Sequence, residues 1–286
     1  MRNIDEDNIT QAVLASFAGC RDERLRAVMT SLVQHLHAFV RQVRLTESEW
    51  FQAIRFLTDT GHITDDQRQE FILLSDTLGV SMLVTALNSR KRKGCTESTV
   101  LGPFFVEGAP QCEDGADITR GAKGEPCWVS GRVTDLAGKP IAGAQIEVWQ
   151  ADADGYYDVQ YPDFDEHRVR GRFVSGADGC FNLKTVLPSS YPIPHDGPVG
   201  KMLAATGRHP WRPAHLHFMI DAGGYKRLIT HVFRRDDRHL DSDAVFGVRS
   251  TLIADWPLRN PGETPDGSVS AVPFHELKFE FVLDAA

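Results

Sequence analysis

The sequence contains little cysteine. Its five cysteines are Cys20, Cys95, Cys112, Cys127 and Cys180. An odd number of widely spaced thiols without a C-x-x-C pair argues against a disulfide framework and against a zinc-thiolate site. The start, MRNIDEDNIT, lacks the basic-then-apolar layout of a signal peptide. We therefore expect the protein in the reducing cytosol.

The chain also lacks a net positive charge and a long apolar run. Its formal net charge of −8 excludes broad electrostatic attraction to nucleic acid. The most apolar stretch, Phe71 to Leu87, contains Asp76 and several hydroxyl groups and is short for a bilayer-spanning helix. We expect no membrane insertion and interpret this stretch as one buried helix.

Proline is absent before Pro103, and the pattern from about Asn8 to Lys93 is helical. After Gly102, proline and glycine become frequent and short β-rich runs alternate with turn signals. The strand candidates are CWVSGRV, IAGAQIEVWQ, RGRFVS, CFNLKTV, HLHFMI, LITHVF and ELKFEFVL. The pattern predicts a mainly β protein with helices: a helical domain over 1–100, then an antiparallel β-sandwich domain over 101–286.

Two histidines share one face of a predicted strand. Side chains alternate along a strand, so His215 and His217 point the same way, a common geometry for metal ligands. His35 and His37 have the same spacing in a helical pattern, where the two side chains diverge by about 200°. We expect that second pair to be a surface pair.

The residues alone leave the remaining ligands open. A single carboxylate would complete the site of an iron(II) oxygenase, and the candidates are Asp152, Asp154 and Asp178. The Asp152–Gly155 segment is also typical of a hairpin turn, and it fails as a calcium loop. Tyrosine, of which the chain has five, is usually a packing residue, and a phenolate near neutral pH needs a strongly Lewis-acidic ion such as Fe(III).

Four segments resemble the intradiol ring-cleaving dioxygenases. They are STVLGPFFVEGAP from Ser98, GAQIEVWQADADGYYDVQY from Gly143, YPIPHDGPVGKMLAATGRHPWRPAHLHFMI from Tyr191 and HLDSDAVFGVRSTLI from His239. The resemblance extends over nearly the whole chain, and the string G-R-H-P-W-R-P-A-H-x-H is long and specific. It implies an enzyme that cleaves an aromatic diol or triol with O₂ between two neighbouring hydroxyl groups.

The same resemblance implies one Fe(III) per chain, held by Tyr157, Tyr191, His215 and His217. Tyr156 directly precedes the first of these ligands, but Tyr157 occupies the matching position. Tyr191 also accepts a substrate proton, and Arg212, which we place at the edge of the same strand as His215, stabilises negative charge on the substrate.

The resemblance further implies the substrate pocket. Its residues are Leu73, Asp76, Val100, Leu101, Gly102, Pro103, Phe104, Ile193, Pro194, Arg212 and Val245. A carboxylate in such a pocket needs a polar partner, and the third hydroxyl of hydroxyquinol (benzene-1,2,4-triol) is one candidate. Nearby backbone is the other candidate partner of Asp76. The expected product is 3-hydroxy-cis,cis-muconate or its tautomer maleylacetate, with catechol or a chlorocatechol as the alternative substrate.

Assembly and the main alternative also follow from resemblance. The helical region is expected to form a homodimer and to hold a phospholipid. The segment GRVTDLAGKPIAGAQIEVW is in addition similar to transthyretin-like modules, which leaves a non-catalytic β-sandwich binding module as the alternative. Such a module would have no need of two tyrosines and two histidines at these places.

Overall fold

The computed structural model describes residues 3–65, 68–161 and 167–286. The chain forms two compact units, Met1–Asp59 and Thr60–Ala286. The helices of the first part are α1 (Ile9–Ser16), the 3-10 turn η1 (Phe17–Gly19), α2 (Glu23–Val43), α3 (Glu47–Ile63), α4 (Glu70–Thr77) and α5 (Val80–Asn88). The predicted helical region is thereby confirmed, whereas the domain boundary at residue 100 stays a prediction.

The first unit shows how local sequence sets the helix ends. Asp22 caps α2 by accepting the Leu25 N–H at 3.0 Å, and Thr46 and Glu49 cap α3 reciprocally. On α2, His35 is exposed and bonds the Ser31 carbonyl, whereas His37 bonds the Thr10 hydroxyl on α1. The two imidazoles diverge as the helical spacing predicted, but only His35 is exposed, whereas His37 is partly buried.

The prediction of one buried helix over Phe71 to Leu87 is wrong. The stretch forms α4 and α5, bent by 77°, because Gly79 adopts a left-handed backbone (φ +73°) that ends the first helix. Leu73 and Met82 are buried, but many apolar side chains of the pair are exposed. Among the described residues no single helix is long and apolar enough to cross a membrane. Only this bent pair, taken together, has the required length and composition.

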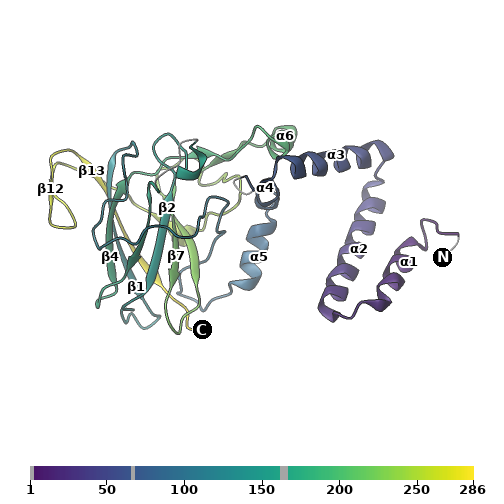
Figure 1. The fold of residues 1–286 in the computed structure, drawn as a ribbon, viewed down its shortest axis with the longest axis horizontal. Coiled ribbons are helices and arrows are strands. Elements are labelled where there is room, and N and C mark those ends of the chain that lie inside the picture. Colours follow the sequence, from purple (N-terminus) through teal and green to yellow (C-terminus); the bar gives the residue numbers. More distant parts are fainter. Residues whose placement is uncertain (1–2, 66–67, 162–166) are drawn as a thin grey trace. The chain divides into compact units, whose positions relative to one another are not determined.

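The second unit contains two stacked sheets (Figure 1). The first has the order β10 (Leu258–Arg259), β13 (Phe274–Val282), β1 (Pro126–Thr134), β4 (Cys180–Val186). The second has the order β3 (Arg170–Val174), β2 (Gln145–Gln150), β7 (His215–Asp221), β8 (Leu228–Arg234), β9 (Ile253–Ala254). Every predicted strand is present.

The prediction of purely antiparallel sheets is wrong in one detail, because both sheets are mixed. β1 pairs with β13 in parallel, and β8 pairs with β9 in parallel. Side chains alternate between the two faces of a strand in parallel and in antiparallel pairs alike. The sequence pattern alone therefore does not reveal the direction of pairing.

The core lies between the two sheets and fixes which side chains face outward. From β7, Leu216, Phe218 and Ile220 enter this core together with side chains of β1, β2, β4 and β13. His215 and His217 therefore point to the opposite face of the five-stranded sheet, as the alternation predicted. The remaining short elements are η2 (Asp158–Gln160), β5 (Tyr191–Pro192), α6 (Pro198–Ala205), β6 (Trp211–Arg212), η3 (Ser250–Leu252), β11 (Gly262–Glu263) and β12 (Val269–Ser270).

Candidate metal centre

Four predicted side chains meet on the outer face of the five-stranded sheet. The Tyr157 hydroxyl lies 2.8 Å from His217 Nε2 and 3.4 Å from His215 Nε2. The hydroxyls of Tyr157 and Tyr191 are 3.3 Å apart, and the two Nε2 atoms are 3.1 Å apart. All four residues are buried. Two phenolic oxygens and two imidazole nitrogens thus converge on one point, which is the arrangement of a metal site.

Tyr157 is held by its immediate surroundings. It is fully buried, and its ring stacks on Phe104 with centroids 4.5 Å apart. Its backbone N–H donates to Gln160 Oε1 at 2.9 Å, at the start of η2. Tyr156, by contrast, is 51% exposed. The structure thus distinguishes the two adjacent tyrosines, because only Tyr157 is buried at the candidate site.

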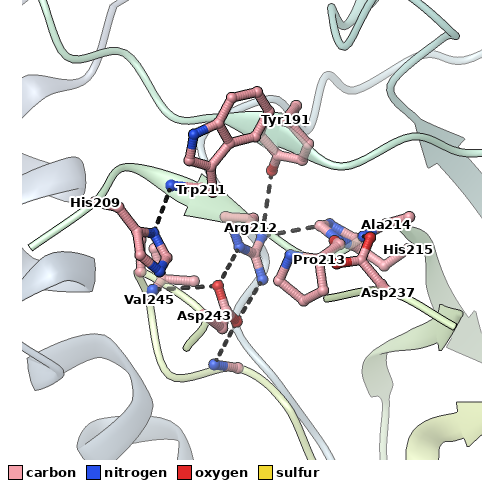
Figure 2. Close-up of polar contacts among 12 residues, drawn as sticks. Tyr191, His209, Trp211, Arg212, Pro213, Ala214, His215, Asp237, Asp243 and Val245 are labelled. Carbon is pink, nitrogen blue, oxygen red and sulfur yellow. Dashed lines mark hydrogen bonds and ion pairs between the residues drawn. The ribbon is translucent and has the colours of Figure 1, made fainter. Parts of the chain in front are cut away.

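Arg212 reaches the cluster from β6, and the prediction that it extends the strand of His215 is wrong. Pro213, which has no N–H, separates β6 from β7. Strand β6 instead pairs with β5, where Arg212 lies opposite Tyr191. Arg212 Nη1 donates to the Tyr191 hydroxyl at 3.3 Å and lies 3.3 Å from His215 Nε2 (Figure 2). Its Nε and Nη2 donate to the two carboxylate oxygens of Asp243.

Burial sets the charge of the cluster. It lowers the pKa of His215 to about 3, with Arg212 adding to the effect, and lowers the pKa values of His217 and His231 well below the ordinary range. Burial, reinforced by Tyr191, also raises the pKa of Tyr157 well above its ordinary value. Neutral imidazoles are metal ligands, and a phenol in such a place ionises only against a strongly positive ion. This donor set therefore fits a metal ion.

The sequence prediction missed a third histidine at the site. His231 on β8 lies directly opposite His217 in the strand register, so both point to the same face. His215, His217 and His231 are all buried, and their candidate ligand atoms lie within 4.8 Å of one another. The run LITHVF was recognised as a strand, but its pairing with β7 is not readable from the sequence.

The carboxylates considered for an iron(II) site have turn roles. Asp152 Oδ1 accepts the N–H groups of Asp154 and Tyr156, and its Oδ2 accepts the Tyr161 hydroxyl at 2.6 Å. Asp178 accepts the Cys180 N–H in another turn. The interpretation of Asp152–Gly155 as a turn is confirmed. Within the described parts of the chain, the histidine cluster includes no carboxylate.

A buried ion pair beside Tyr157 was also missed. The side chains of Asp158 and Arg170 are each 2% exposed, and Arg170 additionally donates to the Phe104 carbonyl at 2.9 Å. Arg170 thereby connects β3 to Asp158, the residue after Tyr157, and to the backbone of Phe104, whose ring stacks on Tyr157. Neither residue stands out in the sequence, because a charged residue in a strand or loop is usually exposed.

Most of the predicted pocket residues surround this cluster. A cavity of about 580 Å³ is lined by Leu73, Pro103, Phe104, Ile193 and Pro194 among others. Leu101 and Val245 pack in the same apolar cluster as Tyr157 and Tyr191. Gly102 has a left-handed backbone, and a Cβ there would come within 3.4 Å of the His217 ring. A glycine at this position therefore lets the backbone approach the site closely.

Asp76 and Val100 are buried but are not among the described residues that line this cavity. Burial raises the pKa of Asp76, while a hydrogen bond with Ser81 and the positive charge of Arg212 act to lower it. Asp76 is therefore a buried carboxyl on the Arg212 side of the cluster, with a hydroxyl partner on α5.

The fold and the site define a class of enzyme. A family model described as "Dioxygenase" matches residues 100–285, and one described as "Catechol dioxygenase N terminus" matches residues 22–96. The chain belongs to the intradiol ring-cleaving dioxygenases.

Individual relatives narrow the similarity. The chain is 57% identical to the 6-chlorohydroxyquinol 1,2-dioxygenase of Cupriavidus pinatubonensis, over 99% of each chain. It is 52% identical to the hydroxyquinol 1,2-dioxygenase of Nocardioides simplex, over 98% of this chain and 96% of that protein. The crystal structure of hydroxyquinol 1,2-dioxygenase from Pseudomonas putida DLL-E4 matches with a TM-score of 0.91 and 49% identity, over 98% of this chain and 99% of that chain.

Proposed function

We propose that this enzyme cleaves hydroxyquinol between two neighbouring hydroxyl groups and adds both atoms of O₂ to the ring carbons. The product is 3-hydroxy-cis,cis-muconate, which tautomerises to maleylacetate. The observation that carries the proposal is the buried convergence of two phenols and two imidazoles within 2.8 to 3.4 Å, beside a guanidinium.

The ion proposed for this donor set is Fe(III), one per chain, held by Tyr157, Tyr191, His215 and His217. Two phenolates neutralise much of its charge, which favours the ferric state over the ferrous state. When bound, the ion supplies the Lewis acidity that ionises both the phenols and the substrate diol.

The protein's own groups then orient and deprotonate the substrate. We assign to the Tyr191 oxygen the role of accepting one hydroxyl proton, since Tyr191 packs in the same apolar cluster as Ile193, which lines the cavity. Arg212 Nη1 donates to that same oxygen and to no carboxylate, so it is placed to stabilise negative charge on the substrate oxygens. Asp243 holds the guanidinium in this orientation through its other two nitrogens.

Two observations support a triol over catechol or a chlorocatechol. The relatives that match at 52% identity or more over nearly the full chain are named for hydroxyquinol or its 6-chloro derivative. Asp76 also supplies a buried carboxyl that interacts with the charge of Arg212, and a third hydroxyl would hydrogen-bond to it. Catechols lack that hydroxyl.

The experiment is turnover in ¹⁸O₂ with hydroxyquinol, 6-chlorohydroxyquinol and catechol as substrates. We expect the hydroxyquinols to react faster, with both labelled oxygens in an open-chain dicarboxylate. A semialdehyde product would contradict intradiol cleavage, and faster turnover of catechol would contradict the substrate assignment. A protein without bound metal and without turnover would favour the binding-module alternative.

The assembly is proposed on the apolar residues of the first unit. On α2, Leu32, Leu36 and Phe39 are about half exposed, and so are Trp50 and Phe51 on α3. Exposed apolar surface of this extent favours a homodimer through these helices, with a phospholipid among them. Sedimentation and mass spectrometry of extracted lipid test these two points. The five free thiols support the reducing cytosol as the compartment.

A further inference from the structure

His231 is an unusual residue for its surroundings. Its side chain is fully buried, yet neither ring nitrogen has a hydrogen-bond partner among the described residues. An imidazole carries at least one N–H donor, and leaving a buried donor or acceptor unsatisfied is costly. Two of its neighbours contact it through their rings and accept or donate no hydrogen bond. The ring centroid of His231 lies 4.1 Å from that of His217, in an edge-to-face arrangement, and 5.4 Å from that of Phe233.

The position of His231 links two parts of the site. Its ring centroid lies 4.6 Å from that of His215. On the opposite side, a Cβ built on Gly247 would lie 3.8 Å from His231 Nδ1, 3.0 Å from Arg212 Nη2 and 3.1 Å from Asp243 Oδ2. His231 therefore lies close to both the histidine pair and the Arg212–Asp243 ion pair, next to a residue that has no side chain.

The geometry argues against His231 as a fifth protein ligand. The Tyr157 hydroxyl lies 2.8 to 3.4 Å from the other three predicted ligand atoms, and the His215 and His217 Nε2 atoms are 3.1 Å apart. His231, by contrast, makes no hydrogen-bond-length contact with any of them in the described structure. His231 is thus left with hydrogen-bonding capacity and without a coordination role.

We propose that His231 hydrogen-bonds an oxygen atom of the reactants at the metal site. This inference rests on the proposed function. The hydrogen-bond partner of His231 is an oxygen atom that carries negative charge. This atom belongs either to the substrate diol or to O₂ during its reaction with the ring. In either case the imidazole fixes the position of the oxygen beside His217, and the oxygen supplies the hydrogen-bond partner that the protein lacks there.

The test compares His231→Leu, which removes both ring nitrogens, with His231→Gln, which restores a donor and an acceptor. Phe233→Leu is the matched control, because it shortens a fully buried ring on the same strand. Five quantities are measured for each protein: iron content, the visible spectrum, the Kd of hydroxyquinol without oxygen, and kcat and KM in air.

We expect the His231→Leu variant to keep its iron and to have a kcat/KM that is about 10- to 100-fold lower than that of the wild type. The His231→Gln variant should retain most of the wild-type kcat/KM. Phe233→Leu should change kcat/KM by less than about threefold. A weaker Kd with an altered substrate-induced spectrum assigns the contact to the diol, whereas an unchanged Kd with a lower kcat assigns it to the oxygen reaction.

Two outcomes overturn the proposal. Loss of iron in His231→Leu, with normal folding by circular dichroism, would make His231 a metal ligand. Wild-type Kd, kcat and spectrum in His231→Leu, or equal losses in His231→Leu and Phe233→Leu, would make it a packing residue. If the wild-type protein itself lacks iron, colour or turnover, it is instead the proposed function that fails.

Discussion

Arg170 binds both carboxylate oxygens of Asp158, Nη2 to Oδ1 at 2.6 Å and Nε to Oδ2 at 3.0 Å, one residue after Tyr157. Both side chains are buried, and Phe104 connects to the same guanidinium through its carbonyl and to Tyr157 through its ring. The ion pair therefore anchors the segment that carries Tyr157.

Removing one partner of this pair should destabilise the protein strongly. Asp158→Ala leaves the Arg170 charge buried without its carboxylate, which costs about 3 to 5 kcal/mol in the free energy of unfolding. The control is Asp255→Ala, because Asp255 pairs with Arg235 at a similar distance of 2.6 Å but both are exposed. That change should cost less than about 1 kcal/mol. Equal losses in urea unfolding would contradict the anchoring role.

Much of the metal centre was predictable because strand alternation is regular. The pattern alone placed His215 and His217 on one face, and the core residues Leu216 and Phe218 on the other. The tyrosines were assigned only by resemblance, since an exposed Tyr156 and a buried Tyr157 have the same sequence pattern.

The parts that were missed depend on tertiary contacts. His231 becomes a neighbour of His217 only through the register of two strands, and Asp243 meets Arg212 from a loop 31 residues away. The break at Gly79 was overlooked because a glycine inside an apolar run has no required conformation until packing selects one.

Arg212 should be required for turnover and not for metal binding. Arg212→Lys keeps a positive charge but loses the guanidinium that bridges Asp243 and Tyr191, so kcat should fall by about 10²- to 10³-fold with normal iron content. Arg208→Lys is the control, since Arg208 donates to the carbonyls of Thr77 and Ala244 instead. A fully active Arg212→Lys enzyme would exclude a catalytic role for the guanidinium.

Asp76 should affect substrate preference more than general activity. Asp76→Ala removes the proposed partner of the third hydroxyl, so kcat/KM for hydroxyquinol should fall about 10-fold or more relative to catechol. Ser81→Ala, which removes only the hydroxyl partner of Asp76, should leave the ratio between the two substrates nearly unchanged. If Asp76→Ala lowers kcat/KM equally for both substrates, Asp76 does not bind the third hydroxyl.

The buried histidines should make stability dependent on pH. In the unfolded chain, His215, His217 and His231 bind protons below about pH 6.5, whereas burial lowers their pKa values in the folded protein, that of His215 to about 3. The unfolded state then binds more protons, so the free energy of unfolding falls as the pH drops from 6.5. The full slope is about 1.4 kcal/mol per histidine and pH unit.

Urea unfolding of the metal-free protein at pH 7.5, 6.5 and 5.5 measures this slope. His231→Leu should reduce it by one histidine's share. Stability that stays level or increases toward pH 5.5 would show that these imidazoles are not held neutral in the folded state.

The most direct test of the whole account is the visible spectrum of the iron-loaded protein, recorded without oxygen before and after hydroxyquinol is added. Two phenolates on Fe(III) predict a broad charge-transfer band that moves to longer wavelength when the substrate binds. Tyr191→Phe should weaken that band and remove most of the turnover. A colourless wild-type protein with one iron per chain would contradict the account, because neither Tyr157 nor Tyr191 would then be a ligand of ferric iron.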